Sequence, residues 1–536
     1  MKVESSGRNR RTPRRGLAAT LTLAGLMLAF APTCFGRVLR VGTYHSVPGQ
    51  YKTIQAAVDA AKPGDWILVG PGDYHEHGIR GADEPAGVLI ETPRLHLRGM
   101  NRNKVIVDGT KRGSPTCSRR ASAQKKTKDG RNGIEVFKAS GVYIENLTVC
   151  NYLTGPNGGE GNEIWWNGGD GSGKIGMGSW WGNYITATST YSNGVDTPFA
   201  DYGIFVSNSR GPGVVNHSYA SGMGDAGYYV GACPNCHALI THAHAQFNAL
   251  GFSGTNAGGH LVIKRSEFDH NKTGPTSDSE NNDDAPSPAN GLCPHKTRGP
   301  LRSGICDIWT RNYIHDNNNP NVPGNSVNGL AGAVPVGSGA ILGGTEYIEL
   351  YRNRIVRNNA WGVWITDSPY MGNPPPGIGQ NCQGGTYINP PPSPNPTCYF
   401  QAYGNEVIHN YFAHNGRYRN PSNGDIAMLT TPHSPGNCFR RNTDPAGLTS
   451  DPPAIQSAPY NPCGQPNGGV DPALLGNALC GTQLLFPCPS NTPGAGYPHA
   501  SKVVLHMPPR QPTMPNPCRD VPPNRWCRAP KHHSHN

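Results

Sequence analysis

The sequence predicts an all-β solenoid, in which parallel strands coil repeatedly around one narrow core. Short β-branched and aromatic runs alternate with turns rich in Gly, Asn and Asp, and Gly (70) and Pro (51) make up 121 of the 536 residues. A motif of the form small–x–apolar–x–x–Asn–x–x–Gly also recurs about every 23 residues. That period is too short for a strand–helix–strand unit, and a propeller blade needs about forty residues, so one coil of a parallel solenoid fits best.

Recurring positions define the repeat. Its first copy consists of Ile240, Ala243, Ala245, Asn248 and Gly251. Adding 23 to each number gives the second copy, which consists of Ile263, Ser266, Phe268, Asn271 and Gly274. A third window follows the same template with Trp309, Asn312, Ile314 and Asn317. A fourth follows it with Leu350, Asn353 and Ile355, and then, after one extra residue, Asn359 and Gly362. Alternate apolar residues are expected to point inward. Stacked Asn side chains are expected to share hydrogen bonds between coils.

Residues 1–36 are predicted to be an export signal. A basic segment ending in Arg14 and Arg15 precedes a short apolar run, and both the general secretory and the twin-arginine routes fit this pattern. Removing residues 1–31 takes away six Lys/Arg and one Glu, so the net charge falls from +11 to +6. That mild charge favours an anionic polymer or surface partner over nucleic acid. We expect a secreted or periplasmic (cell-envelope) protein with no other membrane span.

A short helix is predicted at residues 53–61. Ile54, Ala57, Val58 and Ala61 have helical spacing, Thr53 can cap the N-terminus, and the sequence Lys-Pro-Gly-Asp follows. Such a helix would cover strand edges at the open end of a solenoid.

The segment "YKTIQAAVDAAKPGDWILVGPGDYHE" (residues 51–76), followed by such coils, resembles the right-handed parallel β-helix repeat proteins of the pectin-lyase-like superfamily. The resemblance implies a single-stranded right-handed parallel β-helix over residues 37–440, with the N-terminal helix as its cap. Insertions are expected at about 154–200, 275–305, 318–338 and 372–398, and a Pro- and Cys-rich irregular tail at 441–536. That tail is expected to be mostly coil, held on the solenoid by disulfides.

Cys233, Cys236 and His237 form the C-x-x-C-H pattern of a covalent haem site. A turn between two coil strands offers no haem pocket, so the preferred interpretation is a local disulfide or two cysteines that pair elsewhere, since fifteen cysteines in an exported chain indicate disulfides. His242 and His244 flank an inward position and should both point outward.

The superfamily contains uronate lyases, epimerases, polygalacturonases and methylesterases, together with binding proteins without chemistry, so the fold does not fix the function. The polygalacturonase and methylesterase motifs are absent from the sequence. The first hypothesis is an exported β-helix protein that binds or processes polysaccharide, as a uronate-polymer lyase or epimerase. The alternative is a non-catalytic cell-surface binding protein. A monomer is expected in either case.

Candidate catalytic residues lie close together in the chain. Lys264 or Arg265 could remove the proton α to a uronate carboxylate, with Ca²⁺ held by Asp283 and Asp284. A hydrolase would instead need two carboxylates about 5–10 Å apart, for which Asp225 and Asp269 are the candidates. These side chains are equally compatible with a solvated surface.

A substrate-binding ridge is also predicted. In strands that begin at the recurring Gly, the middle residues should face outward, which selects Phe205, Tyr229, Ser253 and Trp364. Phe205, Tyr229 and Trp364 are the predicted sugar-stacking residues. Four tryptophans of the Gly-rich insertion could form a wall beside them: Trp165, Trp166, Trp180 and Trp181. The alternative is that the insertions fold over the ridge and bury it.

Overall fold

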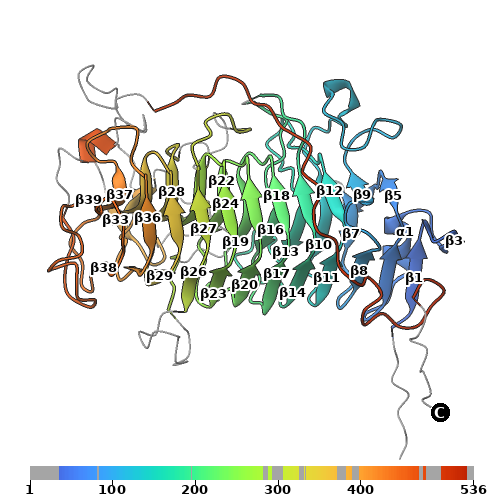
Figure 1. The fold of residues 1–536 in the computed structure, drawn as a ribbon. Coiled ribbons are helices and arrows are strands. Elements are labelled where there is room, and N and C mark those ends of the chain that lie inside the picture. Colours follow the sequence, from blue (N-terminus) through green and yellow to red (C-terminus); the bar gives the residue numbers. More distant parts are fainter. Residues whose placement is uncertain are drawn as a thin grey trace, which may run out of the picture. The chain divides into compact units, whose positions relative to one another are not determined.

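The computed structural model describes residues 36–80, 84–194, 196–281, 288–292, 306–324, 331, 334–370, 382–388, 397–469, 475–478 and 497–527, which belong to one unit, Gly36–Asn536. Its strands follow a repeating three-sided path from the blue to the orange end in Figure 1. The predicted signal and the proposed Ca²⁺ ligands Asp283 and Asp284 lie outside the described residues.

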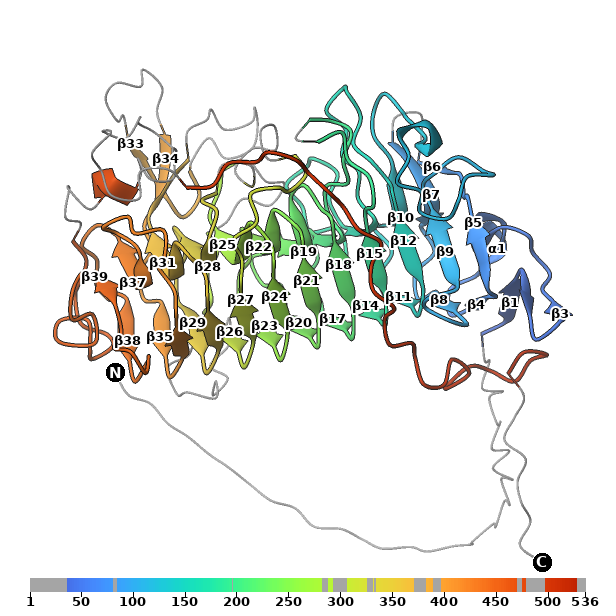
Figure 2. The same cartoon turned by 45° about the horizontal axis from the view of Figure 1, so that its top comes forward.

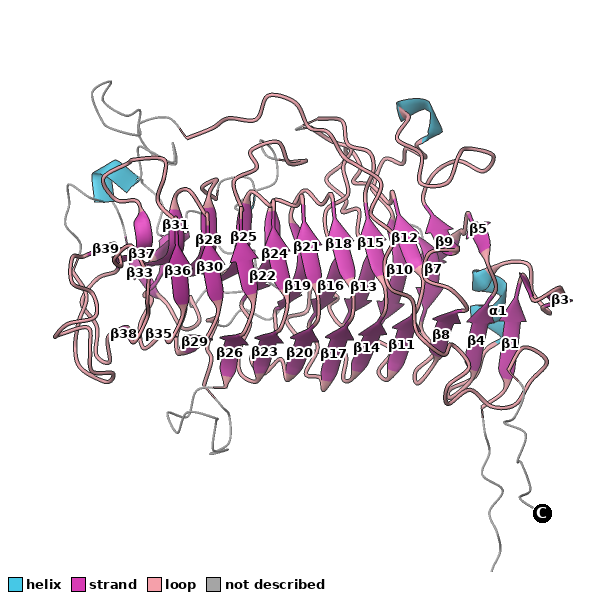
Figure 3. Ribbon diagram, in the orientation of Figure 1, coloured by secondary structure: helices cyan, strands magenta, loops and turns pink. Residues whose placement is uncertain are grey.

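Three long sheets, parallel except for the antiparallel pair β6 and β7, form the sides of the solenoid (Figures 1 and 3). Sheet 1 contains twelve strands: β1 (Val38–Val41), β4 (Trp66–Val69), β8 (His96–Gly99), β11 (Val142–Glu145), β14 (Trp180–Asn183), β17 (Gly213–Asn216), β20 (Ala238–Thr241), β23 (Leu261–Lys264), β26 (Asp307–Thr310), β29 (Ile348–Tyr351), β35 (Glu406–Ile408) and β38 (Cys438–Arg440). Sheet 2 contains ten: β5 (Gly72–Tyr74), β9 (Val105–Asp108), β12 (Thr148–Cys150), β15 (Thr186–Thr188), β18 (Tyr219–Ser221), β21 (His244–Gln246), β24 (Glu267–Asp269), β27 (Tyr313–His315), β30 (Arg354–Val356) and β36 (Tyr411–Ala413). Sheet 3 contains twelve: β6 (Gly78–Arg80), β7 (Glu84–Ile90), β10 (Asn132–Phe137), β13 (Ile164–Asn167), β16 (Ile204–Ser207), β19 (Ala226–Gly231), β22 (Leu250–Thr255), β25 (Thr273–Asp278), β28 (Ser338–Gly343), β31 (Trp361–Thr366), β37 (Gly424–Leu429) and β39 (Ser450–Asp451).

The remaining elements lie at the ends and in loops. Helix α1 (Ile54–Ala60) caps the N-terminal end, as predicted, and Thr53 accepts a hydrogen bond from the backbone of Ala56 (3.3 Å). Figure 3 shows this helix beside β1 and β4. The short strands and the 3-10 helix outside the long sheets are β2 (Thr43–Tyr44), β3 (Val47–Pro48), β32 (Ser368–Tyr370), β33 (Thr386–Ile388), β34 (Thr397–Phe400) and Ala121–Ala123. No described helix is long and apolar enough to cross a membrane.

The core is built from the positions that the repeat predicts. Ile240 pairs in register with Ile263, and Ala245 with Phe268, as the 23-residue template requires. All four side chains are buried in one continuous apolar cluster along the solenoid. The chain is therefore a parallel β-helix, as the resemblance implied.

Asparagine ladders join the coils at two corners. At the corner between sheets 2 and 3, each side-chain Nδ2 donates to the next Oδ1 at 3.0–3.3 Å along the series Asn248, Asn271, Asn317, Asn358 and Asn415. At the corner between sheets 1 and 2, the series is Asn312, Asn353, Asn410 and Asn442 (3.0–3.1 Å). The predicted ladder is confirmed, with one correction: Asn358, not Asn359, occupies the ladder position, because the extra residue enters after the ladder.

Cys233 and Cys236 form a local disulfide, which confirms the preferred interpretation of the C-x-x-C-H pattern. Four further disulfides join described cysteines: Cys117–Cys150, Cys382–Cys398, Cys438–Cys463 and Cys518–Cys527.

The segment predicted as an insertion at 154–200 contributes a coil of its own. Strands β13, β14 and β15 lie inside it, and the core accommodates the buried Trp166 and Trp180. The Gly-rich composition concealed these strands. At the other end, β39 pairs with β37, so strand pairing continues beyond the predicted end of the solenoid at residue 440.

Described residues 497–527 form an extended segment, here called the strap. It runs back along the solenoid from the orange end to the blue end, passing β15 (Figure 2). Arg102 is buried and donates to the backbone oxygen of Pro512 in the strap (3.1 Å) and to Thr186 of β15 (2.7 Å). Further along, Trp526 donates to the backbone oxygen of Val47 (2.9 Å). The strap is mostly coil, as predicted, but hydrogen bonds rather than disulfides join it to the N-terminal coils.

Candidate functional site

The outer face of sheet 2 carries the polar side chains most suited to chemistry. Its strands from β12 to β36 are three residues long, with an apolar central residue that points into the core, such as Ala245, Phe268 and Ile314. The first and third residues must therefore face outward. In β21, β24 and β27 these outward positions are His244, Gln246, Glu267, Asp269, Tyr313 and His315.

Asp269 is the centre of a His–carboxylate–His arrangement. Its Oδ1 lies 2.6 Å from Nε2 of His244, and its Oδ2 contacts Nδ1 of His270. Gln246 also donates to Oδ2 (3.1 Å) and accepts a hydrogen bond from Tyr219 (2.8 Å). Asp269 is nearly buried, whereas the side chains of His244 and His270 are 30% and 52% exposed. Each histidine therefore presents its ring toward solvent while Asp269 fixes it from behind.

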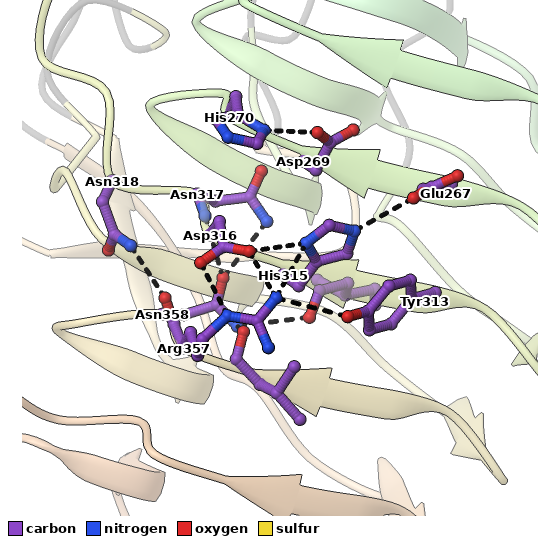
Figure 4. A network of polar contacts seen from close by, with 12 residues as sticks. Glu267, Asp269, His270, Tyr313, His315, Asp316, Asn317, Asn318, Arg357 and Asn358 are labelled. Atoms are coloured by element: carbon purple, nitrogen blue, oxygen red, sulfur yellow. Dashed lines mark hydrogen bonds and ion pairs between the residues drawn. The ribbon is translucent and has the colours of Figure 1, made fainter.

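A second network continues across the next coils (Figure 4). Nε2 of His315 lies 3.1 Å from Glu267, and its Nδ1 lies 2.7 Å from Asp316. Arg357 donates to both carboxylate oxygens of Asp316 (2.8 and 2.5 Å) and to the hydroxyl of Tyr313 (3.3 Å). Strand pairing places His315 directly beside Asp269, so the two networks are neighbours.

These contacts shift the pKa values of the cluster. Burial alone would raise the pKa of Asp269, but hydrogen bonds from His244 and His270 outweigh it and hold that pKa well below its usual range. The hydrogen bond to Asp269 in turn raises the pKa of His270. Burial opposes the charge on His315, yet Glu267 and Asp316 raise its pKa above the ordinary value. The neighbouring carboxylates thus favour the protonated forms of His270 and His315.

The cluster offers two kinds of chemistry. Imidazoles with raised pKa values next to fixed carboxylates can donate and accept protons near neutral pH. His244, Glu267 and Asp269 also present ligand atoms within 4.8 Å of one another, a spacing that allows a divalent cation.

Only Asp269 of the predicted catalytic residues lies in this cluster. Lys264 and Arg265 precede it around a corner and line a different cavity, of about 630 Å³, on the outer face of sheet 1. Asp225 accepts a hydrogen bond from Tyr202 (2.9 Å) at the start of β19, away from the bonding partners of Asp269. The hydrolase pair Asp225 and Asp269 therefore belongs to two separate groups. Lys264 and Asp269 are close in sequence, but a corner of the solenoid lies between them and places Lys264 on sheet 1 and Asp269 on sheet 2.

The prediction of an open, sugar-binding ridge on sheet 3 is wrong. The outward direction was right, since Ile204 and Val206 face the core, but Phe205, Tyr229, Ser253 and Trp364 are all buried. Tyr202 packs against Phe205 (4.4 Å between ring centroids), and Trp361 packs against Trp364 (4.5 Å). The ridge is thus a secondary core.

The four tryptophans expected to form a wall are also separated. Trp166 and Trp180 are fully buried in the core. Trp165 stacks on Phe205 (5.0 Å), and Trp181 stacks on Tyr143 (4.3 Å) on the outer face of sheet 1.

Sequence reasoning missed most of the cluster. His244 was predicted to be outward but solvated, and Glu267, His315, Asp316 and Arg357 were not tied to one site. The signal was available: the register that aligns Ala245, Phe268 and Ile314 also aligns their neighbours Gln246, Asp269 and His315. Applied to the outward-facing positions, this register predicts that Gln246, Asp269 and His315 lie side by side.

No family model matches this chain, and no curated protein matches it. Among solved structures, it is similar to the A-module of mannuronan C-5 epimerase AlgE4 from Azotobacter vinelandii (14% identity, 74% of this chain and 93% of that chain, TM-score 0.41). Pectate lyase Pel9A matches at 13% identity over 88% of this chain and 90% of that chain (TM-score 0.37). A rhamnogalacturonan lyase matches at 11% over 77% and 89% (TM-score 0.35). At such identities and scores, no activity of this chain follows from the likeness.

Proposed function

We propose that this is an exported protein that processes an acidic polysaccharide on the outer face of sheet 2, as a uronate-polymer lyase or epimerase. The observation that supports the proposal most is the group His244–Asp269–His270. One carboxylate holds two half-exposed histidines, and each histidine keeps a second ring nitrogen outside these hydrogen bonds.

Lyases and epimerases share a first step, the removal of the proton α to the uronate carboxylate. Nδ1 of His244, the ring nitrogen outside the hydrogen bond to Asp269, would accept that proton. His270, whose pKa Asp269 raises, would supply a proton, either to the departing glycosidic oxygen in elimination or to the opposite face of the sugar in epimerisation. His315 and Arg357 would add positive charge near the substrate carboxylate.

The proposal is tested by incubating the purified protein with polygalacturonate and with alginate, with and without Ca²⁺. Absorbance by unsaturated uronate reports elimination, and proton NMR of the polymer reports epimerisation. We expect turnover by the wild type, a loss of at least a hundredfold in His244→Ala, and unchanged turnover in the exposed control Asp196→Asn. Wild-type protein that yields neither product would refute the catalytic role.

The second candidate is a non-catalytic polysaccharide-binding protein. It is favoured by the pairing of His315, whose two ring nitrogens both face carboxylates and leave no lone pair for chemistry. Retention by the polymers in affinity electrophoresis, without either product, would support this function.

A further inference from the structure

A basic residue or histidine occupies one backbone position in seven successive coils, directly after each sheet 1 strand at the corner with sheet 2. All have left-handed backbone, with φ between 50° and 58°. The backbone N–H of Arg265 donates to the residue before Arg311, and that of Arg311 to the residue before Arg352, which keeps the series in register. We call this series the corner row: His217, His242, Arg265, Arg311, Arg352, His409 and Arg441.

Backbone conformation does not explain the charge of the corner row. Left-handed φ values favour Gly and Asn over long side chains, and two earlier coils place Asn146 and Tyr184 at the same position. At the corner between sheets 2 and 3, equally left-handed residues are of mixed character: Phe247, His270, Asp316 and Arg357. The repeated basic side chains are therefore not a consequence of the left-handed backbone.

The arginines of the corner row are exposed and have no ion-pair partner among the described residues. Arg265, Arg311, Arg352 and Arg441 are exposed, and the ion pairs between described residues include none of them. Behind them, the buried ladder Asn312, Asn353, Asn410 and Asn442 fixes the backbone. The arginines are thus held on a rigid edge, with Arg265, Arg311 and Arg352 in three successive coils and Arg441 two coils further on.

The strap contacts this corner in a coil that precedes the corner row. Asn146 occupies the equivalent position in an earlier coil, and its Oδ1 accepts hydrogen bonds from Thr513 and Met514 of the strap (2.7 and 2.8 Å). From His242 onward the position is exposed in most coils. Asn146 therefore lies in a part of the corner that the strap contacts, whereas the four arginines lie where the position is exposed.

A cavity of about 630 Å³ adjoins the middle of the corner row. Arg265 and Arg311 line it together with Lys264, and its described lining contains no Asp or Glu. Sheet 1 supplies apolar lining residues, Val214, Leu239, Val262 and Ile308. Apolar surface beside cations suits a sugar ring that carries an acidic group, because the ring presents C–H groups on its faces and charge at its edge.

We propose that the corner row is a docking track for a linear, negatively charged polysaccharide, separate from the sheet 2 cluster. Neighbouring coils lie about 4.8 Å apart, so Arg265, Arg311 and Arg352 form a line of cations along the solenoid, with Arg441 two coils beyond Arg352. Each exposed ion pair is weak, but a line of them adds up when the polymer carries charges at regular intervals. The proposal rests on the proposed function only for the kind of polymer, and it does not require the sheet 2 face to be catalytic.

The test compares two variants with equal net charge. The row variant carries Arg265→Asn, Arg311→Asn and Arg352→Asn; asparagine tolerates the left-handed backbone and stands at this position in Asn146. The control variant removes three exposed arginines elsewhere: Arg119→Asn, Arg417→Asn and Arg419→Asn. Affinity for polygalacturonate, dextran sulfate and neutral dextran is measured at several salt concentrations, and circular dichroism checks the fold.

We expect the wild type and the control variant to bind both polyanions and not dextran. The row variant should bind the polyanions about tenfold more weakly, with a shallower salt dependence. Equal weakening of both variants would attribute binding to net charge and overturn the proposal, as would unchanged binding by the row variant. If the row variant loses binding while the wild type turns over no polymer, the docking track stands and the proposed catalysis fails.

Discussion

The hydrogen-bond partners and charge states of individual residues on this solenoid depend on residues of the next coil. Asp269 and His270 are neighbours in sequence, but His244 reaches Asp269 only because one coil lies on the next. The same stacking places Glu349 of β29 beside Glu406 of β35 on sheet 1. Whether a group is charged therefore depends on residues tens of positions away.

Replacing Asp269 by Asn should lower the pKa of His270, because the hydrogen bond to that carboxylate is the main cause of its elevation. The expected direction is toward the ordinary histidine value of about 6.5. NMR titration of the histidine ring protons measures it. Asp196→Asn, in an exposed loop, should leave the titration unchanged. An unaltered His270 pKa in Asp269→Asn would contradict the hydrogen-bonded arrangement.

Glu349 should make stability fall as the pH rises. It is fully buried, and burial together with the charge of Glu406 raises its pKa to about 8, against an opposing effect of Arg440. A carboxyl with a raised pKa stabilises the fold fully below its unfolded pKa of about 4.5, and this contribution is lost as the pH rises through about 8.

Glu349→Gln stays neutral at every pH and should remove this decline. Thermal unfolding at pH 5 and pH 9 measures it: the Tm of the variant should exceed that of the wild type at pH 9 by more than at pH 5. Glu91→Gln, an exposed position, serves as the matched control. A Tm difference that does not grow with pH would show that Glu349 is ionised in the fold.

At the scale of elements, the corners also join the coils, at positions that the strands do not reach. The sheet 2 strands from β12 to β36 are only three residues long, and the ladder asparagines satisfy backbone groups that such short strands leave open at the corners. Asn317 illustrates this: its Oδ1 accepts from the backbone N–H of Asn271, and its Nδ2 donates to the backbone oxygen of Phe268.

Asn317→Ala should cost about 1–3 kcal/mol, because it leaves those buried backbone groups without partners. Urea unfolding measures the change. Asn193→Ala, which removes an exposed loop hydrogen bond, should cost less than about 1 kcal/mol. Equal costs in the two variants would show that the ladder adds no more than a surface contact.

The whole molecule is tied end to end by the strap. Arg102 is the central link, since its guanidinium donates to His217, Ile185 and Thr186 of the solenoid as well as to Pro512. In a solenoid each coil contacts only its neighbours, so a segment that joins distant coils adds coupling that the repeat lacks.

Arg102→Ala should therefore loosen the N-terminal coils more than the C-terminal ones, with a local cost of about 3 kcal/mol for the lost charged hydrogen bonds. Hydrogen–deuterium exchange should quicken in β9, β12, β15 and the strap and remain unchanged in β31 and β37. Arg419→Ala, exposed and outside these contacts, is the control. Uniformly faster exchange along the solenoid would indicate global rather than local loss.

The sequence by itself determined the β-helix, the capping helix, the inward and outward positions and the asparagine ladder. These features follow from periodicity, which acts over one or two coils. It also predicted the outward direction of Phe205, Tyr229 and Trp364, but left open whether insertions bury them.

Only the tertiary structure decided which outward faces stay open. Loops and their aromatic residues cover the sheet 3 ridge, a corner separates Lys264 and Arg265 from Asp269, and the strap reaches back to Arg102 across more than four hundred residues. Such contacts have no period in the sequence. They depend on where long insertions and the tail come to rest, and that is set by packing between segments distant in the chain.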